Sequence, residues 1–405
     1  MLQHPVVIVG AKRTPIGNFL GCFKSLSAPQ LASTAIKAAL EQAAVKVEAI
    51  DEAIIGCVLT AGIGQAPARQ AALGAGLLPS TGCVTINKVC GSGLKAIMFA
   101  HDLIFANHQK IILAGGMESM TNAPYLLPKA RQGYRIGHGE LTDHLVYDGL
   151  EDAYHKGQVM GLFAEATAKK FGYSREQQDA YAITSVERAQ QAIQSGICAK
   201  ETTPVHVMSR SGESEVINTD EGPLTANIAK IPQLRPAFSQ DGTITAANSS
   251  SISDGAAAVI LTSAAHAKQY QLQPLAQIVG FTTHAQEPEW FTTAPIGAIQ
   301  KLLTQLNWSV ADVDLFEINE AFSVVVMAAM QQLSIPHNKV NVHGGACVLG
   351  HPIGASGARL IVTLLNALQV QQKHRGIAAL CLGGGEAVAM AIERIQSRIT
   401  FQWQK

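Results

Sequence analysis

Short runs of apolar residues alternate along this chain with longer stretches in which apolar residues recur every three or four positions. The short runs predict buried strands at residues 6–9, 53–58, 84–89, 110–114, 256–261, 276–280, 313–317 and 377–382, with a loop at 10–15. The recurring stretches predict helices at residues 28–44, 66–70, 94–105, 175–195 and 356–368. Strands that alternate with helices are typical of an α/β fold whose sheet lies between layers of helices.

The order of elements in the first third of the chain recurs in the last third. Residues 84–105 and residues 340–368 are each predicted as a strand, a glycine-rich turn and a helix. The strand and the glycine-rich turn at 111–118 recur at 377–386. We therefore expect two copies of one α/β unit, with strand ends of one copy facing strand ends of the other.

Between the two copies lies a stretch of different character. Residues 122–243 are richer in proline, tyrosine, histidine and charged residues, and their apolar runs are short. We interpret this stretch as an inserted loop domain, with one long helix that begins after the N-cap Ser174. The N-terminal half is then formed by residues 1–121 plus 244–272, and the C-terminal half by residues 273–405.

Composition limits the classes of function. The chain has 405 residues, is 47% hydrophobic, and carries 30 basic and 30 acidic residues. A net charge of zero offers no electrostatic attraction to nucleic acid or to an anionic membrane, and no apolar stretch approaches 18 uninterrupted residues. Seven cysteines without CxxC spacing argue against a disulfide framework or a zinc site. The first nine residues lack a targeting profile, so we expect a soluble, cytoplasmic protein.

The first candidate for chemistry is Cys90, in the sequence Asn87-Lys88-Val89-Cys90-Gly91-Ser92-Gly93. Its neighbours predict a position where a buried strand ends and a helix begins. A thiol at a helix N-terminus faces free backbone N–H groups and the positive end of the helix dipole, and both favour the reactive thiolate. The alternative from this stretch alone is a small buried cysteine that only packs.

Three further clusters contain residues suited to acid–base chemistry. His351 lies between Gly350 and a proline at a predicted turn, where an imidazole could take a proton from a thiol, although a lone histidine is often structural. Cys381 is followed by three glycines whose backbone N–H groups suit an oxyanion, although this cysteine could equally be a packing residue. Asn319 follows an apolar run and could equally be a helix cap.

Taken together, these clusters resemble the thiolase family. The similar motifs run in the family's order from Lys12 to Gly385, which is nearly the whole chain. They are Arg13-Thr14-Pro15-Ile16-Gly17, Gly64-Gln65-Ala66-Pro67-Ala68-Arg69-Gln70, the Cys90 turn, Gly115-Gly116-Met117-Glu118-Ser119-Met120, Asp254-Gly255-Ala256-Ala257, Asn319-Glu320-Ala321-Phe322, Gly350-His351-Pro352 and Cys381-Leu382-Gly383-Gly384-Gly385.

The resemblance implies an α/β fold with a layered α-β-α-β-α core, and a reversible condensation of two acetyl-CoA to acetoacetyl-CoA and CoA. Cys90 would carry the acetyl group as a thioester after His351 has deprotonated it. Cys381 would move a proton to or from the α-carbon of acetyl-CoA. Asn319 would hold a water that stabilises the enolate oxygen together with His351. The backbone N–H groups of Cys90 and Gly383 would form an oxyanion hole.

The resemblance also implies how the substrates are held. Ser250 takes the family's position beside the pantetheine, and Met160 and Phe322 fall beside the acyl group. No metal and no cofactor are expected, because the coenzyme A thioesters are themselves substrates. The implied partners are acetyl-CoA, acetoacetyl-CoA and CoA, and residues 129–144 fall where subunits of a homotetramer touch.

The sequence departs from the family pattern in places that bear on substrate binding. Ser251 stands where the family usually has glycine, and Val159 stands where it commonly has histidine. Leu224 occupies the place of an expected arginine. These departures leave open how the adenine and phosphates are held. They also leave open a 3-ketoacyl-CoA thiolase of broader chain length, acting in fatty acid degradation, as the alternative.

A rival from a different class is a thiolase-like carrier of CoA or lipid without catalysis. Such a protein is expected to lack one of the three groups that move protons or carry the acyl chain. Cys90, His351 and Cys381 are all present in this chain, which favours the enzyme.

Overall fold

A computed structural model describes residues 5–208 and 212–395 of the chain. Within these residues, ten strands form one mixed sheet in the order β12-β13-β14-β11-β1-β10-β5-β3-β4, with β2 paired to β10. The first half contributes β1 (Val6–Arg13), β2 (Gly17–Asn18), β3 (Glu52–Gly56), β4 (Gly82–Ile86), β5 (Ile111–Ser119) and β10 (Ser253–Ser263). The second half contributes β11 (Ala276–Ala285), β12 (Leu315–Ile318), β13 (Arg375–Leu382) and β14 (Glu386–Arg394).

The two halves of the sheet are joined by a short seam. Strand β1 pairs with β11 through only two residue pairs, Val7 with Gln277 and Ile8 with Ala276. By contrast, β10 pairs with β5 along nine residues, from Asp254 to Thr262. The two halves are therefore parts of one sheet that is continuous only through this short pairing of β1 with β11.

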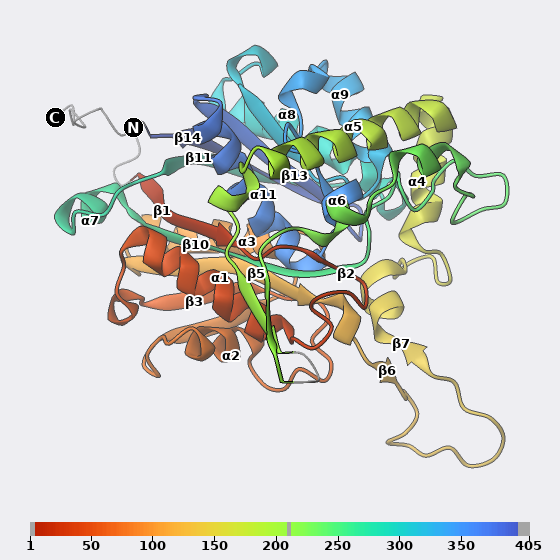
Figure 1. The fold of residues 1–405 in the computed structure, drawn as a ribbon, viewed down its shortest axis with the longest axis horizontal. Helices are drawn as coiled ribbons and strands as arrows, with labels where there is room; N and C mark the ends of the chain where they lie inside the picture. Colours follow the sequence, from red (N-terminus) through yellow and green to blue (C-terminus); the bar gives the residue numbers. More distant parts are fainter. Residues whose placement is uncertain (1–4, 209–211, 396–405) are drawn as a thin grey trace.

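Helices cover the sheet in three layers (Figure 1). The first-half strands are covered on one face by α1 (Ala28–Ala43) and α2 (Pro67–Gly74), and the second-half strands by α8 (Ala294–Leu306) and α9 (Ser323–Leu333). Between the halves lie α3 (Ser92–Phe105) and α11 (Ile353–Val370), in one apolar core that contains strand residues from both halves. The expected α-β-α-β-α core is thereby confirmed.

The two central helices touch through glycines. A Cβ atom on Gly93 of α3 would lie 2.8 Å from the backbone nitrogen of Ala358 on α11. A Cβ on Gly357 of α11 would likewise collide with the backbone of Leu94 on α3. Only residues without a side chain permit this approach, which brings the N-termini of the two helices together.

The central position of α11 explains its composition. Among the described residues it is the one helix long and apolar enough to cross a membrane, with 18 residues that are interrupted by Arg359 and Asn366. Its window is 89% buried inside the protein. Packed between the two halves of the sheet, the helix must be apolar on nearly all sides, as core helices of large proteins are.

Residues 122–243 form smaller elements outside the layers (Figure 1). Their elements are β6 (Tyr125–Leu126), β7 (Thr142–Asp143), the π-turn Val146–Leu150, α4 (Met160–Phe171), α5 (Arg175–Gln194), β8 (Val205–Met208), β9 (Ser214–Ile217) and α6 (Glu221–Thr225). The long helix starts as expected, with Ser174 accepting from the backbone N–H of Gln177. The loop between β6 and β7 projects from the body of the molecule. The domain boundaries stay a prediction, and residues 1–4, 209–211 and 396–405 of those domains lie outside the described residues.

Four expectations about strands are wrong. The glycine-rich turn expected within residues 111–118 does not form, because β5 continues through Gly115 and Gly116 to Ser119. The strand predicted at 84–89 is β4, which ends at Ile86 and lies at the edge of the sheet, so that Val84 is 40% exposed rather than buried. The loop predicted at 10–15 starts later, because β1 continues to Arg13 in its pairing with β10. The strand expected at the start of 340–368 is reduced to a single bridge between Phe316 and Val340. The shorter helix α10 (Ala346–Leu349) follows it.

A buried ionic cluster ties the inserted segment to both halves. The Arg13 guanidinium, 1% exposed, contacts Glu201 at 2.7 Å and both carboxylate oxygens of Asp220 at 2.7 and 2.9 Å. Thr363 and Asn366 of α11 donate to the same Glu201 carboxylate. One cation thus satisfies two buried carboxylates from a segment distant in sequence.

This cluster yields a prediction about stability. Arg13→Met removes the cation and leaves two buried carboxylates without their partner, which we expect to cost about 3–5 kcal/mol of unfolding free energy. The measurement is thermal or denaturant unfolding of the variant beside the unchanged protein. Lys37→Met, at an exposed site on α1, is the control and should change stability by no more than about 0.5 kcal/mol. Equal stability of the two variants would contradict the structural role of the cluster.

Candidate active site

Cys90 lies in a tight turn between β4 and α3. Val89, the residue before it, has a left-handed backbone with φ of 46°, which is uncommon for a β-branched side chain. Side chains hold this turn: Asn87 accepts from the backbone N–H of Val89 at 2.9 Å. Ser92 accepts from the N–H of Lys88 at 2.8 Å and donates to the carbonyl of Val89 at 2.6 Å. The thiol is therefore fixed by local hydrogen bonds rather than by a regular strand.

The glycine turn of the second half lies against the Cys90 turn. The backbone N–H of Gly383 donates to the Cys90 thiol, and a Cβ on Gly91 would lie 2.6 Å from the side chain of Leu382. Lys88 forms an ion pair of 2.5 Å with Glu386, the first residue of β14. The two turns, one from each copy of the α/β unit, are thus held together, as the repeat predicted.

The expectation of a thiolate at Cys90 is wrong for the resting protein. Burial raises the pKa of the Cys90 thiol to about 12, although the backbone N–H groups of Gly383 and of Cys90 itself act in the opposite direction. Loss of water around the sulfur thus outweighs the donors at the start of the helix. A neutral thiol needs a base before it can attack, and the nearby groups must supply one.

His351 is positioned for that purpose by the start of α11. Its Nδ1 lies 2.5 Å from the hydroxyl of Ser356, and that hydroxyl also lies 2.9 Å from the carbonyl of Pro352. A hydroxyl has one hydrogen, and the carbonyl can only accept, so Ser356 donates to Pro352 and accepts from Nδ1–H. The lone pair of His351 is then on Nε2. Burial, and secondarily the charge of Arg359, lowers the pKa of His351 to about 3, so the ring is neutral at pH 7.

Asn319 directly follows β12, and Cys381 is the last residue but one of the neighbouring parallel strand β13. The amide nitrogen of Asn319 lies 3.4 Å from Nε2 of His351, and its backbone N–H donates to the carbonyl of Ala379 on β13. Cys381 is 1% exposed, and burial raises its pKa, with a further increase from Cys90. Cys381 is joined to the Cys90 turn through its neighbour Leu382, whose side chain packs against Gly91.

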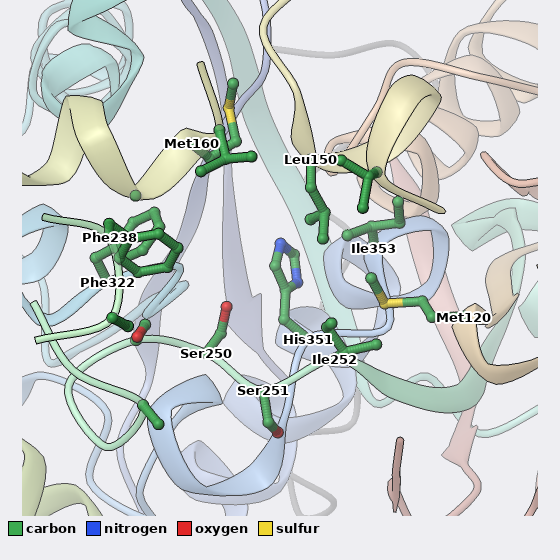
Figure 2. A pocket seen from close by; sticks show the side chains of 16 residues that line it. Met120, Leu150, Met160, Phe238, Ser250, Ser251, Ile252, Phe322, His351 and Ile353 are labelled. Atoms are coloured by element: carbon green, nitrogen blue, oxygen red, sulfur yellow. The ribbon is translucent and has the colours of Figure 1, made fainter. Parts of the chain in front are cut away.

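An apolar cavity of about 360 Å³ opens beside these residues (Figure 2). Four of the predicted residues line it: His351, Ser250, Met160 and Phe322. The imidazole of His351 and the hydroxyl of Ser250 point into the same space in Figure 2. The site thus combines a polar centre with a largely hydrophobic wall, which suits a small apolar group carried on a longer polar arm.

The other four predicted residues, Cys90, Cys381, Asn319 and Gly383, do not line this cavity; Asn319 contacts the lining residue His351, and Gly383 contacts Cys90. Cys90 packs against the apolar cluster that contains Met120 and Ile353, two lining residues. Cys381 belongs to the cluster of Phe322. The structure therefore brings all eight predicted residues to one region, four on the surface of the cavity and four next to it.

The three residues that depart from the family pattern lie in different parts of the structure. Val159 lines the cavity, whereas Leu224 is 65% exposed on α6. Ser251 also lines the cavity, but its hydroxyl lies 3.1 Å from the hydroxyl of Ser253 and points away from His351 (Figure 2).

No sequence pattern predicted Phe238, which lies in an irregular segment and closes one side of the cavity. Its ring meets that of Phe322 edge to face, with centroids 6.0 Å apart. Gly161 makes room for it, since any Cβ at that position would collide with the Phe238 ring. A short apolar residue pattern around 238 carries no periodic signal, so only the folded chain reveals its role.

A buried carboxylate, Glu118, also went unassigned although its motif was noted. It accepts from the backbone N–H groups of Val58, Leu59 and Gly354, at 3.0, 3.1 and 2.9 Å. Burial nevertheless raises the pKa of Glu118 to about 7. The Glu118 carboxylate therefore connects the loop after β3 to the first turn of α11, and it stabilises the turn that carries His351.

The site has no metal centre in the part of the chain that the structure describes. Within residues 5–208 and 212–395, no three His, Cys, Asp or Glu side chains are grouped so that they could hold an ion. The chemistry available is that of two thiols, one neutral imidazole, one amide and the backbone N–H groups of two turns.

Comparison with known proteins gives a consistent result along the whole chain. The family model "Thiolase, N-terminal domain" matches residues 6–265, and "Thiolase, C-terminal domain" matches residues 272–394. The chain is 46% identical to "Acetyl-CoA acetyltransferase" of Cupriavidus necator, over 96% of this chain and 99% of that one. It is 48% identical to "Acetyl-CoA acetyltransferase 2" of Arabidopsis thaliana, with 96% of each chain covered.

A solved structure agrees with the sequence comparisons. The crystal structure of Acat5 thiolase from Ascaris suum in complex with coenzyme A matches with a TM-score of 0.91 and 43% identity. The match covers 96% of this chain and 100% of that one. Both family models and near-complete relatives therefore agree with the fold, and the chain belongs to the thiolase family.

Proposed function

We propose that this protein condenses two molecules of acetyl-CoA reversibly to acetoacetyl-CoA and CoA, through an acetyl thioester on Cys90. One observation carries the proposal: the Cys90 turn of the first half packs against the turn from Cys381 to Gly385 of the second half, beside an apolar cavity lined by His351. The names of the relatives, acetyl-CoA acetyltransferases at 46–48% identity, support the same reaction.

In the first step, Nε2 of His351 takes the thiol proton while the sulfur of Cys90 attacks the carbonyl carbon of acetyl-CoA. The new C–S bond forms, and the bond to the CoA sulfur breaks. Cys381 gives its proton to the leaving CoA thiolate and is left as a thiolate. The backbone N–H groups of Cys90 and Gly383 stabilise the negative oxygen of the tetrahedral intermediate.

In the second step, the Cys381 thiolate takes a proton from the methyl group of a second acetyl-CoA. Protonated His351 and a water held by Asn319 stabilise the enolate oxygen. The enolate carbon attacks the acetyl group on Cys90, so a C–C bond forms and the C–S bond to Cys90 breaks. His351 then returns its proton to Cys90, and both thiols end as they began. The reaction consumes no cofactor.

A broader 3-ketoacyl-CoA thiolase is the second candidate. One relative, a "Probable acetyl-CoA acyltransferase" of Staphylococcus aureus, is 44% identical over 96% of this chain. The walls of the cavity argue for short chains, because Met160, Phe322 and Phe238 fill the side of α4 with bulky groups. The presence of both thiols and of His351 in one region argues against a carrier without catalysis.

The proposal includes a cytoplasmic homotetramer. All seven cysteines are free thiols, as suits a reducing compartment. The projecting loop between β6 and β7 exposes apolar side chains at its ends and tip: Ile136 is 99% exposed and Leu141 65%. Exposed apolar groups of this kind are typical of a contact between subunits.

The first test concerns the nucleophile. Incubation with acetyl-CoA alone should add one acetyl group per chain, and peptide mapping should locate it on Cys90. Cys90→Ala should abolish both the label and turnover, because no other group is placed to carry the acetyl chain. Cys83→Ala, on the adjoining strand β4, is the matched control and should retain both. Labelling that persists in Cys90→Ala would reject the assignment.

The second test separates the two thiols. Cys381→Ser should still form some acetyl-enzyme, more slowly, since the attack of Cys90 does not require removal of an α-proton and only the protonation of the leaving CoA is impaired. Exchange of the acetyl-CoA methyl protons with deuterated water should fall by about 100-fold or more in the same variant, which is the usual contribution of a general base. The exchange is followed by mass spectrometry. An unchanged exchange rate would mean that Cys381 is structural and that another base acts.

The third test concerns chain length. Two additional methylenes must enter a cavity already bordered by bulky residues, and each methylene discriminates by about 1–3 kcal/mol. We expect kcat/KM for thiolysis of acetoacetyl-CoA to exceed that for 3-ketohexanoyl-CoA by at least about tenfold. Met160→Ala should narrow the difference by enlarging the cavity. Equal efficiency on both substrates in the unchanged protein would favour the broad-range thiolase instead.

A further inference from the structure

Two buried polar side chains that the reaction steps above leave unused, Glu317 and Arg359, are connected to His351 through Asn319. Glu317 on β12 and Arg359 on α11 are 1% and 2% exposed, and the Arg359 Nη1 lies 2.7 Å from a Glu317 carboxylate oxygen. The Nη2 of the same guanidinium lies 3.3 Å from Oδ1 of Asn319, which is fully buried. Asn319 in turn reaches His351 with its amide nitrogen. This series of contacts thus runs from a carboxylate to the edge of the active site.

The chemistry of the guanidinium decides which way the Asn319 amide faces. A guanidinium has only donors, so it can accept nothing from an amide NH₂ group. The oxygen of Asn319 must therefore face Arg359, and the NH₂ group must face His351, as the distances have it. With the amide rotated by half a turn, two donors would face each other in a buried site, and the oxygen would face His351.

Arg359 cannot easily move to accommodate the rotated amide. Its Nη1 is held by Glu317, and its aliphatic part lies on a helix packed between the two halves of the sheet. Its Nε has no hydrogen-bond partner among the described residues. The contacts with Glu317 and Asn319 are thus its specific polar interactions, and a guanidinium satisfies both at once because its nitrogens are fixed in one plane.

We propose that Arg359, held by Glu317, is a positioning residue that orients the Asn319 amide with its NH₂ toward the substrate oxygen. This inference rests on the proposed function and adds to it. An NH₂ that donates to the bound water leaves both hydrogens of that water for the enolate oxygen. A rotated amide takes one of these hydrogens and turns the negative end of its carbonyl toward the developing charge. The orientation therefore matters for the enolate and not for acetylation of Cys90.

The test is a double-mutant cycle on the two half-reactions. Arg359→Lys keeps the charge but not the planar pair of donors, so it should slow methyl-proton exchange by at least about tenfold. Acetylation of Cys90 should continue at the unchanged rate, and KM for acetyl-CoA should stay the same while kcat falls. If Arg359 acts through Asn319, adding Arg359→Lys to Asn319→Ala should cause no further loss.

Two controls make the outcomes distinct. Arg375→Lys changes another arginine paired with a glutamate, Glu393, at the far end of β13, and should leave both half-reactions intact. If Arg359→Lys does not fold, Glu317→Gln combined with Arg359→Met removes both charges together and should show the same loss of exchange.

The possible results separate the two proposals. If the losses of exchange rate caused by Arg359→Lys and Asn319→Ala add in the double variant, Arg359 is merely structural. The same conclusion follows if a folded Arg359→Lys variant loses acetylation and exchange equally. An unchanged exchange rate in Arg359→Lys would overturn the inference as well. If the unchanged protein is not acetylated at all, the proposed reaction itself is wrong. A high-resolution crystal structure of Arg359→Lys then tests the inference about Arg359. The inference is overturned if the Asn319 amide keeps its orientation and hydrogen bonds in that variant.

Discussion

The contact between α3 and α11 is the constraint on which the rest of the structure depends. Both helices lie between the two halves of the sheet, and they approach until backbone meets backbone at Gly93 and Gly357. Each helix begins directly after a turn that carries a reactive side chain, Cys90 for α3 and His351 for α11. A side chain at either glycine would push the helices apart, and the two turns with them. Packing of the central layer therefore sets the spacing of the reacting groups.

Buried polar groups then fix the loops that the helices bring together. Glu118 binds backbone N–H groups from the loop after β3 and from α11. Arg13 plays the corresponding part for the inserted segment, through Glu201 and Asp220. Each group would be costly to bury alone, and each is satisfied by partners from distant parts of the chain. The polar interior thereby specifies how the segments are arranged, while the apolar layers supply most of the burial.

Much of this arrangement could be predicted from the sequence. Helices such as Ala28–Ala43 and Arg175–Gln194 have clear periodicity and caps, and their limits were predicted to within one residue. The edge position of β4 could not be predicted, because Val84 and Ile86 look the same in a central strand as at an edge. The order of strands depends on contacts between distant segments, and no local pattern encodes it.

The residues of the candidate site divide in the same way. Cys90, His351, Cys381 and Asn319 stand out because each follows or precedes a turn, where side chains can face a common space. Their protonation states were not predictable. The sequence indicates the helix N-terminus, which lowers the pKa of the Cys90 thiol, but it does not indicate the loss of water around that thiol, which raises the pKa. Arg359 escaped notice because it lies in the middle of an apolar helix, where no turn or glycine marks it.

The shifted pKa values have a consequence for how charge is distributed during the reaction. With the pKa of Cys90 raised to about 12, that of Cys381 also raised and that of His351 lowered to about 3, every proton-moving group is uncharged at pH 7. A substrate thioester, also uncharged at its reacting end, therefore enters without displacing water from an ion. Charge develops only as bonds form and break. It then lies next to backbone N–H dipoles that are already oriented and need not move. The backbone N–H groups of the resting site are arranged for the negative charge that develops on the substrate oxygen in the transition state. Their electrostatic interactions therefore favour the transition state over the bound substrate.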